Sequence, residues 1–111
     1  MDTLTICTTC ADGQGRALLE AVENEALARD WPLPVRGQAC MSACSRSCTA
    51  ALQGAGKHSY LFGQLAADAA SVEALLDVAA QHAQAGDGLL AWDRRPERLK
   101  GGLIARLPPL A

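Results

Sequence analysis

The sequence predicts a single α/β domain built on a mixed four-stranded sheet with flanking helices, and three observations lead to this prediction. The chain has 111 residues, which suits one domain, because domains most often contain about 100–150 residues. Half of the residues are hydrophobic and 20% are charged, a balance typical of a folded chain. Strand-like and helix-like hydrophobic patterns also alternate along the first 91 residues.

A strand, a helix and a second strand are expected first. Residues 3–7 are mostly apolar and β-branched, which favours a strand. Apolar residues recur at helical spacing over 16–29, and the prolines that follow end this helix, because residues before proline avoid the helical region. Alternating residues predict a strand over 35–39. These elements form a βαβ unit with parallel strands.

A hairpin and a helix are expected next. Residues 49–53 and 58–62 are strand candidates around a glycine-containing turn. Apolar residues over 72–83 form one helical stripe, with Ser71 placed to cap its start and Gly86 its end. Strand, helix, strand, hairpin and helix, in this order, make the thioredoxin-like core.

The segment after residue 91 is expected to be an irregular tail, because it is rich in proline and glycine. The predicted organisation is a domain over 1–91 and a basic tail over 92–111 that wraps it, with Trp92 packed on the core. Residues 1–90 carry a net charge of −5, and residues 91–111 carry +3. This basic tail is either simply solvated or a docking patch for an acidic partner. Its basic residues are Arg94, Arg95, Arg98, Lys100 and Arg106.

Composition also bears on location and partners. No run of 18 apolar residues is present, so a membrane-spanning helix is not expected. The start of the chain lacks the basic region of a signal peptide, which predicts a cytoplasmic protein. The pI of about 5.6 argues against a nucleic-acid partner.

The five cysteines are the unusual feature of this chain. An odd number excludes complete pairing into disulfides, and in a reducing compartment clustered cysteines are more often metal ligands or catalytic thiols. Cys7 and Cys40 lie at the carboxyl ends of the two predicted parallel strands, so both belong at the same end of the sheet. The two cysteine groups are therefore expected to converge; they comprise Cys7 and Cys10, and Cys40, Cys44 and Cys48.

Metal binding is the first interpretation of this pattern. The pairs Cys7-x2-Cys10 and Cys40-x3-Cys44 supply four soft thiolates, which suit zinc or an iron–sulfur cluster. The wider second spacing differs from a zinc ribbon and favours a 2Fe–2S cluster. Two alternatives stay open: cysteines that act as small core residues, and a dithiol oxidoreductase working through Cys7 and Cys10.

Four other residues are weaker candidates. His58 and His82 could bind metal, although lone histidines are more often surface or core groups. Arg46 lies inside the cysteine-rich segment, where its charge could raise a cluster's potential or meet a partner's carboxylate. Lys57 is interpreted as a residue of the hairpin turn.

The segment Cys40-Met41-Ser42-Ala43-Cys44 resembles the Cys-x-x-Ala-Cys loop of thioredoxin-like 2Fe–2S ferredoxins and of the thioredoxin-like subunit of respiratory NADH dehydrogenase. This resemblance implies that Cys7, Cys10, Cys40 and Cys44 hold the cluster. The first pair is closer in sequence than in those ferredoxins, and Cys48 is an additional thiol. Either Cys10 or Cys48 is therefore the fourth ligand.

The whole chain is similar to a small bacterial family of predicted metal-binding proteins, domain-of-unknown-function family 1636. The matching elements are Cys7–Cys10, Cys44–Cys48, Gly56–Tyr60, Arg95-Pro96 and Lys100–Pro109. The resemblance implies genes that lie near those of cobalamin biosynthesis and metal handling, and it assigns no reaction.

The predicted function is therefore electron transfer by one 2Fe–2S cluster on cysteine thiolates, without catalysis by the chain itself. A protein redox partner is expected to dock near the cluster or the basic tail, and a homodimer is a further expectation. The first alternative is a zinc- or cobalt-binding protein linked to cobalamin or metal homeostasis. The second is the dithiol oxidoreductase.

Overall fold

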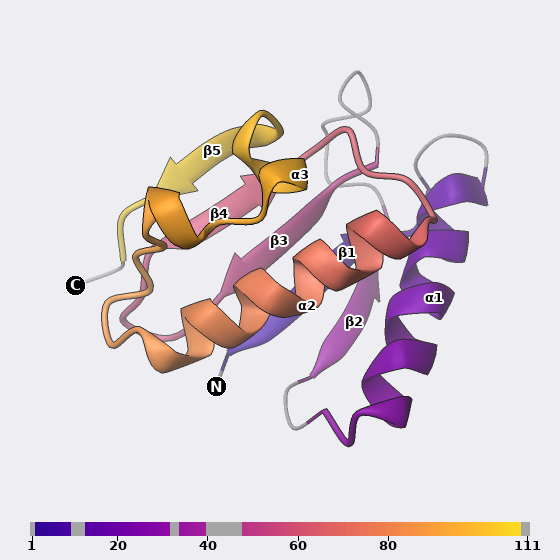
Figure 1. The fold of residues 1–111 in the computed structure, drawn as a ribbon, viewed down its shortest axis with the longest axis horizontal. Coiled ribbons are helices and arrows are strands. Elements are labelled where there is room, and N and C mark those ends of the chain that lie inside the picture. The colour runs from indigo at the N-terminus through magenta and orange to yellow at the C-terminus, as the bar shows by residue number, and fades with distance from the viewer. Residues whose placement is uncertain (1, 10–12, 32–33, 40–47, 110–111) are drawn as a thin grey trace.

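The structure is a computed structural model that describes residues 2–9, 13–31, 34–39 and 48–109 (Figure 1). The described strands form one five-stranded sheet in the order β2-β1-β3-β4-β5. The strands are β1 (Thr3–Cys7), β2 (Val35–Gln38), β3 (Ala50–Gln53), β4 (Ser59–Phe62) and β5 (Leu103–Leu107). The helices are α1 (Gln14–Ala28), α2 (Ala69–Gln84), the short 3₁₀-helix η3 (Trp92–Arg94) and the single turn α3 (Glu97–Lys100).

Strand direction brings several chain segments to one edge of the sheet. β1 is parallel to β2 and antiparallel to β3, and the other neighbouring pairs are antiparallel. The carboxyl ends of β1, β2 and β4 therefore lie at the same edge as the amino ends of β3 and β5. We call this edge the cysteine end; it comprises Cys7–Thr9, Gln38–Ala39, Cys48–Thr49, Gly63–Leu65 and Arg98–Gly102.

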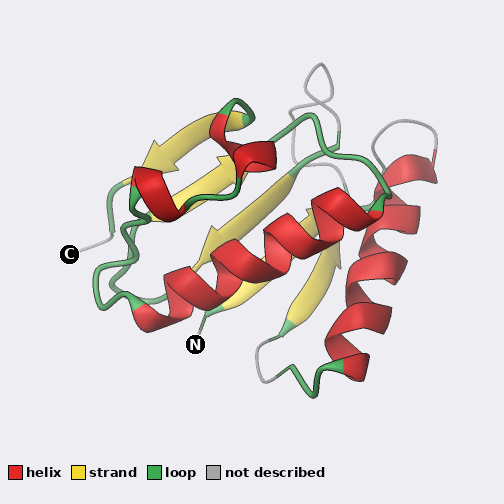
Figure 2. Cartoon of the chain, in the orientation of Figure 1, coloured by secondary structure: helices red, strands yellow, loops and turns green. Residues whose placement is uncertain are grey.

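Both long helices cover the same face of the sheet (Figures 1 and 2). α1 buries the stripe that its helical periodicity predicts, including Leu18 and Val22, and α2 buries Leu75 and Val78. Between helices and sheet, Tyr60 and Phe62 of β4 stack with their ring centroids 5.9 Å apart. The radius of gyration of 12.7 Å is that of a compact single domain. No helix in the described ranges is long and apolar enough to cross a membrane.

The predicted mixed sheet is confirmed, but the expected number of strands is wrong. The sheet has five strands, because Leu103–Leu107 of the expected irregular tail pairs with β4 as β5. Two short helices, η3 and α3, precede this strand. The tail is therefore partly built into the domain.

Three smaller expectations are also corrected. α2 is capped by Asp68, whose carboxylate accepts a hydrogen bond of 2.8 Å from the Ser71 backbone N–H, rather than by Ser71 itself. It ends at Gln84 with Ala85 as its C-cap, short of Gly86. Trp92 is 57% exposed instead of packed into the core, and the cations of Arg95 and Lys100 lie over its ring.

Candidate functional site

Cys7 is the last residue of β1 and is completely buried. Its backbone N–H donates to the Thr49 carbonyl at 3.0 Å, and the N–H of Thr8 donates to the Gln38 carbonyl at the same distance. The apolar, β-branched sequence before Cys7 places it in a central strand with a neighbour on each side. The thiol is therefore held at a fixed point of the sheet, away from water.

Cys48 lies at the same end, two residues before β3 begins at Ala50. It is 1% exposed, and it exchanges two backbone hydrogen bonds with Leu65, at 3.1 and 3.0 Å. Extending the register of β1 against β3, in which Ile6 pairs with Ala50, places Cys48 one position beyond the partner of Cys7. The backbones of two cysteines from distant parts of the sequence thus lie at neighbouring positions of the sheet end.

Thr9 brings a hydroxyl to the same place. Its Oγ1 lies 3.7 Å from the Cys7 sulfur. A hydroxyl can donate to a thiolate, and hydrogen bonds to sulfur are one of the factors that set the potential of a thiolate-bound metal centre. Thr9, two residues after Cys7, therefore brings a polar group next to the sulfur of this candidate ligand.

The remaining predicted cysteine ligands, Cys10, Cys40 and Cys44, lie outside the described residues, as does Arg46. Within the described ranges, no three side chains of histidine, cysteine, aspartate or glutamate gather closely enough to hold a metal ion. Buried sulfur in an apolar surrounding is nevertheless the donor chemistry that zinc and iron–sulfur centres use. The two described thiols fit such a group, and the complete ligand set stays a prediction.

Charged groups border the cysteine end on the side of α3. The Arg98 guanidinium Nη2 donates to the Gln64 carbonyl oxygen at 2.6 Å. The pKa of Asp68 is lowered, chiefly because the Ser71 backbone N–H donates to its carboxylate, and the nearby positive charge of Arg98 adds to this effect. Part of the predicted basic segment therefore contacts the connection whose next residue, Leu65, pairs with Cys48.

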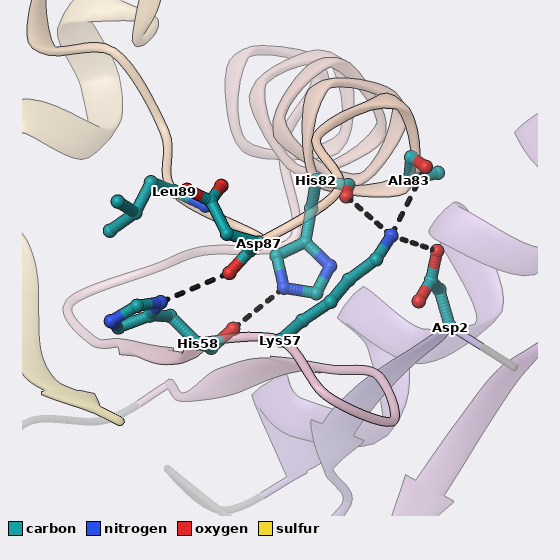
Figure 3. Close-up of polar contacts among 7 residues, drawn as sticks. All are labelled: Asp2, Lys57, His58, His82, Ala83, Asp87 and Leu89. Carbon is teal, nitrogen blue, oxygen red and sulfur yellow. Dashed lines mark hydrogen bonds and ion pairs between the residues drawn. The ribbon is translucent and has the colours of Figure 1, made fainter. Parts of the chain in front are cut away.

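The two histidines and Lys57 form a separate cluster at the opposite end of the sheet (Figure 3). The buried ring of His82 places Nε2 2.8 Å from the His58 carbonyl, so this nitrogen carries the proton, and His58 Nδ1 lies 3.0 Å from the Asp87 carbonyl. Lys57 Nζ contacts Asp2 Oδ2 at 2.8 Å and the carbonyls of His82 and Ala83. These contacts connect the hairpin to the end of α2, and the structure does not bring the histidines to Cys7 or Cys48.

Two contributors to the cysteine end are not predicted from the sequence. Gln64 and Arg98 lack the type and spacing of metal ligands or catalytic groups, so no motif marks them. The only signal is the clustering of basic residues after position 91, which indicates a charged segment without indicating which carbonyl it contacts.

Two solved structures have folds similar to that of this chain. A thioredoxin-like [2Fe-2S] ferredoxin from Aquifex aeolicus superimposes with a TM-score of 0.60 at 17% identity, covering 100% of this chain and 97% of that chain. A cysteine-to-serine variant of the thioredoxin-like [2Fe-2S] ferredoxin from the same organism gives a TM-score of 0.59 at 15% identity, covering 95% and 99%. The fold is therefore thioredoxin-like, as the order of elements predicts.

A search of curated proteins finds no match. The family model described as "Protein of unknown function (DUF1636)" matches residues 4–109, which is nearly the whole chain. This agrees with the resemblance carried by the cysteine pair, the Gly56–Tyr60 segment and the C-terminal motif. The chain belongs to the DUF1636 family.

Proposed function

We propose that this protein is a small electron carrier that holds one 2Fe–2S cluster on cysteine thiolates. The observation that carries the proposal is the placement of Cys7 and Cys48, which come from distant segments and are buried at neighbouring positions of one sheet end. The likeness of the fold to two ferredoxin structures supports it. Cys7, Cys10, Cys40 and Cys44 are the proposed ligands, with Cys48 as the alternative to Cys10.

The chemistry of the bound cluster would be one-electron exchange. The described residues then act by position and polarity. Burial of Cys7 and Cys48 excludes water from their sulfurs, which lowers the local dielectric constant around any charge they carry. If Cys7 binds the cluster as a thiolate, the Thr9 hydroxyl, 3.7 Å away, would donate toward its sulfur and stabilise the negative charge. No described group is assigned a catalytic step, since we propose a carrier that passes electrons to a protein partner.

The partner and the assembly stay predictions. α3 and its basic residues lie at the cysteine end, which favours this side for docking an acidic surface over the far end of the sheet. Formation of a homodimer also stays a prediction.

Anaerobic purification followed by visible spectroscopy and iron, sulfide and zinc analysis tests the cofactor. We expect sulfur-to-iron charge-transfer bands with about two irons and two sulfides per chain. A colourless protein containing zinc or cobalt contradicts the proposal and supports metal handling. A protein without metal that forms a reducible disulfide between Cys7 and Cys10 supports the oxidoreductase instead.

Single Cys→Ser variants test the ligands. We expect Cys7→Ser, Cys40→Ser and Cys44→Ser to lose the bands, and only one of Cys10→Ser and Cys48→Ser to do so. Far-ultraviolet circular dichroism of each variant separates loss of the cluster from loss of the fold, which matters because Cys7 and Cys48 belong to the core. If all five variants keep the bands, the ligand assignment is wrong.

A further inference from the structure

The connection that follows β4 contains an extra residue opposite Cys48. β3 and β4 pair with Ala50 opposite Phe62, so an uninterrupted ladder would place Gln64 opposite Cys48. Cys48 instead exchanges both backbone hydrogen bonds with Leu65. One residue is therefore inserted between Phe62 and Leu65, which is the arrangement of a β-bulge.

Gln64 takes the unusual backbone conformation within this insertion. Its φ of 59° lies in the left-handed region, which costs a non-glycine residue of the order of 1 kcal/mol. Such a conformation persists only where surrounding contacts hold it. The position of Leu65, and with it the pairing with Cys48, depends on those contacts.

The contacts come from the C-terminal segment. Arg98 Nη2 donates to the Gln64 carbonyl oxygen at 2.6 Å, a charge-assisted hydrogen bond. One residue earlier, the Gly63 N–H donates to the Gly102 carbonyl at 2.7 Å. Among the described residues, Arg98 is the one whose side chain donates a hydrogen bond to the Gln64 carbonyl.

We propose that Arg98 is a positioning residue for Cys48. By binding the Gln64 carbonyl, it holds the bulge, aligns Leu65 with Cys48 and keeps this thiol at its buried place. The significance of that place for a metal centre depends on the proposed function, whereas the control of Cys48 by Arg98 does not.

Alkylation of the reduced, metal-free protein tests this proposal. Iodoacetamide labelling of Cys48 and Cys7 is followed by peptide mass spectrometry, and the ratio of the two rates is compared between variants. We expect Arg98→Met to raise the Cys48-to-Cys7 ratio about fivefold, because loss of a charge-assisted hydrogen bond favours local opening. Arg98→Lys, which can still donate, should restore a ratio close to that of the wild type. Arg94→Met is the matched control, because Arg94 enters the hydrogen bonds of the described residues only through its backbone.

An unchanged ratio in Arg98→Met overturns the proposal. Equal acceleration of both cysteines also overturns it, since Arg98 would then stabilise the whole fold rather than Cys48. These results do not depend on a cluster, so iron and sulfide analysis of the wild type decides separately whether the proposed function holds. If the wild type carries a cluster, Arg98→Met should in addition alter its visible circular dichroism, and Arg94→Met should not.

Discussion

Lys57 joins three parts of the chain through one ammonium group. Nζ lies 2.8 Å from Asp2 Oδ2, just before β1, and 2.9 and 3.1 Å from the carbonyls of His82 and Ala83 in the last turn of α2 (Figure 3). The last carbonyls of a helix lack partners within the helix and carry partial negative charge. Lys57 therefore satisfies the end of α2 and fixes it against the hairpin and the start of β1.

Replacement of Lys57 by methionine tests this role. We expect Lys57→Met to lower the free energy of unfolding by about 2–3 kcal/mol, because it leaves the mostly buried Asp2 carboxylate and two helix carbonyls without their cation. Urea denaturation measures the change. Arg16→Met, at an exposed position of α1, is the control and should change stability by no more than about 0.5 kcal/mol. Equal effects of the two substitutions would refute the role of Lys57.

For single residues, the sequence predicts the local position in the chain better than the contacts that the side chain makes. The turn position of Lys57 follows from its neighbouring glycines, but its contact with α2 depends on a helix 25 residues away in sequence. His82 illustrates the same limit, because a histidine in an apolar helix stripe is compatible with a ligand or with a core group. Its hydrogen bond to the His58 carbonyl assigns it to the core.

Elements with strong periodicity are the ones that the sequence predicts well. β1, α1, β2, the hairpin and α2 all occur near their expected places, because each buries one regular face. β5 is missed because Leu103–Leu107 is short and lies between glycine and proline pairs, which ordinarily mark loops. The partner strand β4, far away in sequence, supplies the hydrogen bonds that make it a strand.

Gly102, just before β5, lies too close to the backbone of Gly63 for any residue with a side chain. A Cβ on Gly102 would lie 2.8 Å from the Gly63 carbonyl oxygen, whereas a Cβ on Gly101 would meet nothing within 4 Å. We therefore expect Gly102→Ala to lower the free energy of unfolding by about 1–3 kcal/mol, because backbone must move. Gly101→Ala should stay within about 0.5 kcal/mol of the wild type, and thermal or urea unfolding measures both. Similar stabilities of the two variants would contradict the close approach.

For the whole molecule, the basic C-terminal segment completes the core as well as carrying charge. Leu99 is completely buried and Arg95 is 7% exposed over the Tyr60 ring. β5 covers the edge of β4. The predicted boundary between a domain over 1–91 and a tail therefore has a direct test in truncated chains.

A chain that ends at residue 91 should lose cooperative unfolding. Its β4 would become an exposed edge, and the space filled by Leu99 would be empty. Circular dichroism during urea titration, with size-exclusion chromatography, measures the loss. A chain that ends at residue 107 keeps β5 and should unfold cooperatively. Full cooperativity in the shorter chain would show that residues 1–91 fold alone.

The sequence predicts the chemistry of the candidate site, but it predicts the positions of the site residues only in part. Cysteine spacing and the βαβ pattern predict that thiols converge at the carboxyl end of β1, and Cys7 lies there. The position of Cys48 depends on the bulge, in which the residue with a positive φ is Gln64 rather than its neighbour Gly63, so the residue types do not mark this conformation. The contact of Gln64 with Arg98 cannot be predicted from the sequence either, because it joins residues 34 positions apart.

Cys7 and Cys48 become neighbours only when β1 has paired with β3, and their sequence separation means that the unfolded chain rarely brings them together. A metal group that requires both thiols would bind the folded chain almost exclusively. Binding would then add to the stability of the native state by mass action. Metal content would thus be a measure of correct folding, since only chains in which β1 has paired with β3 would bind the group.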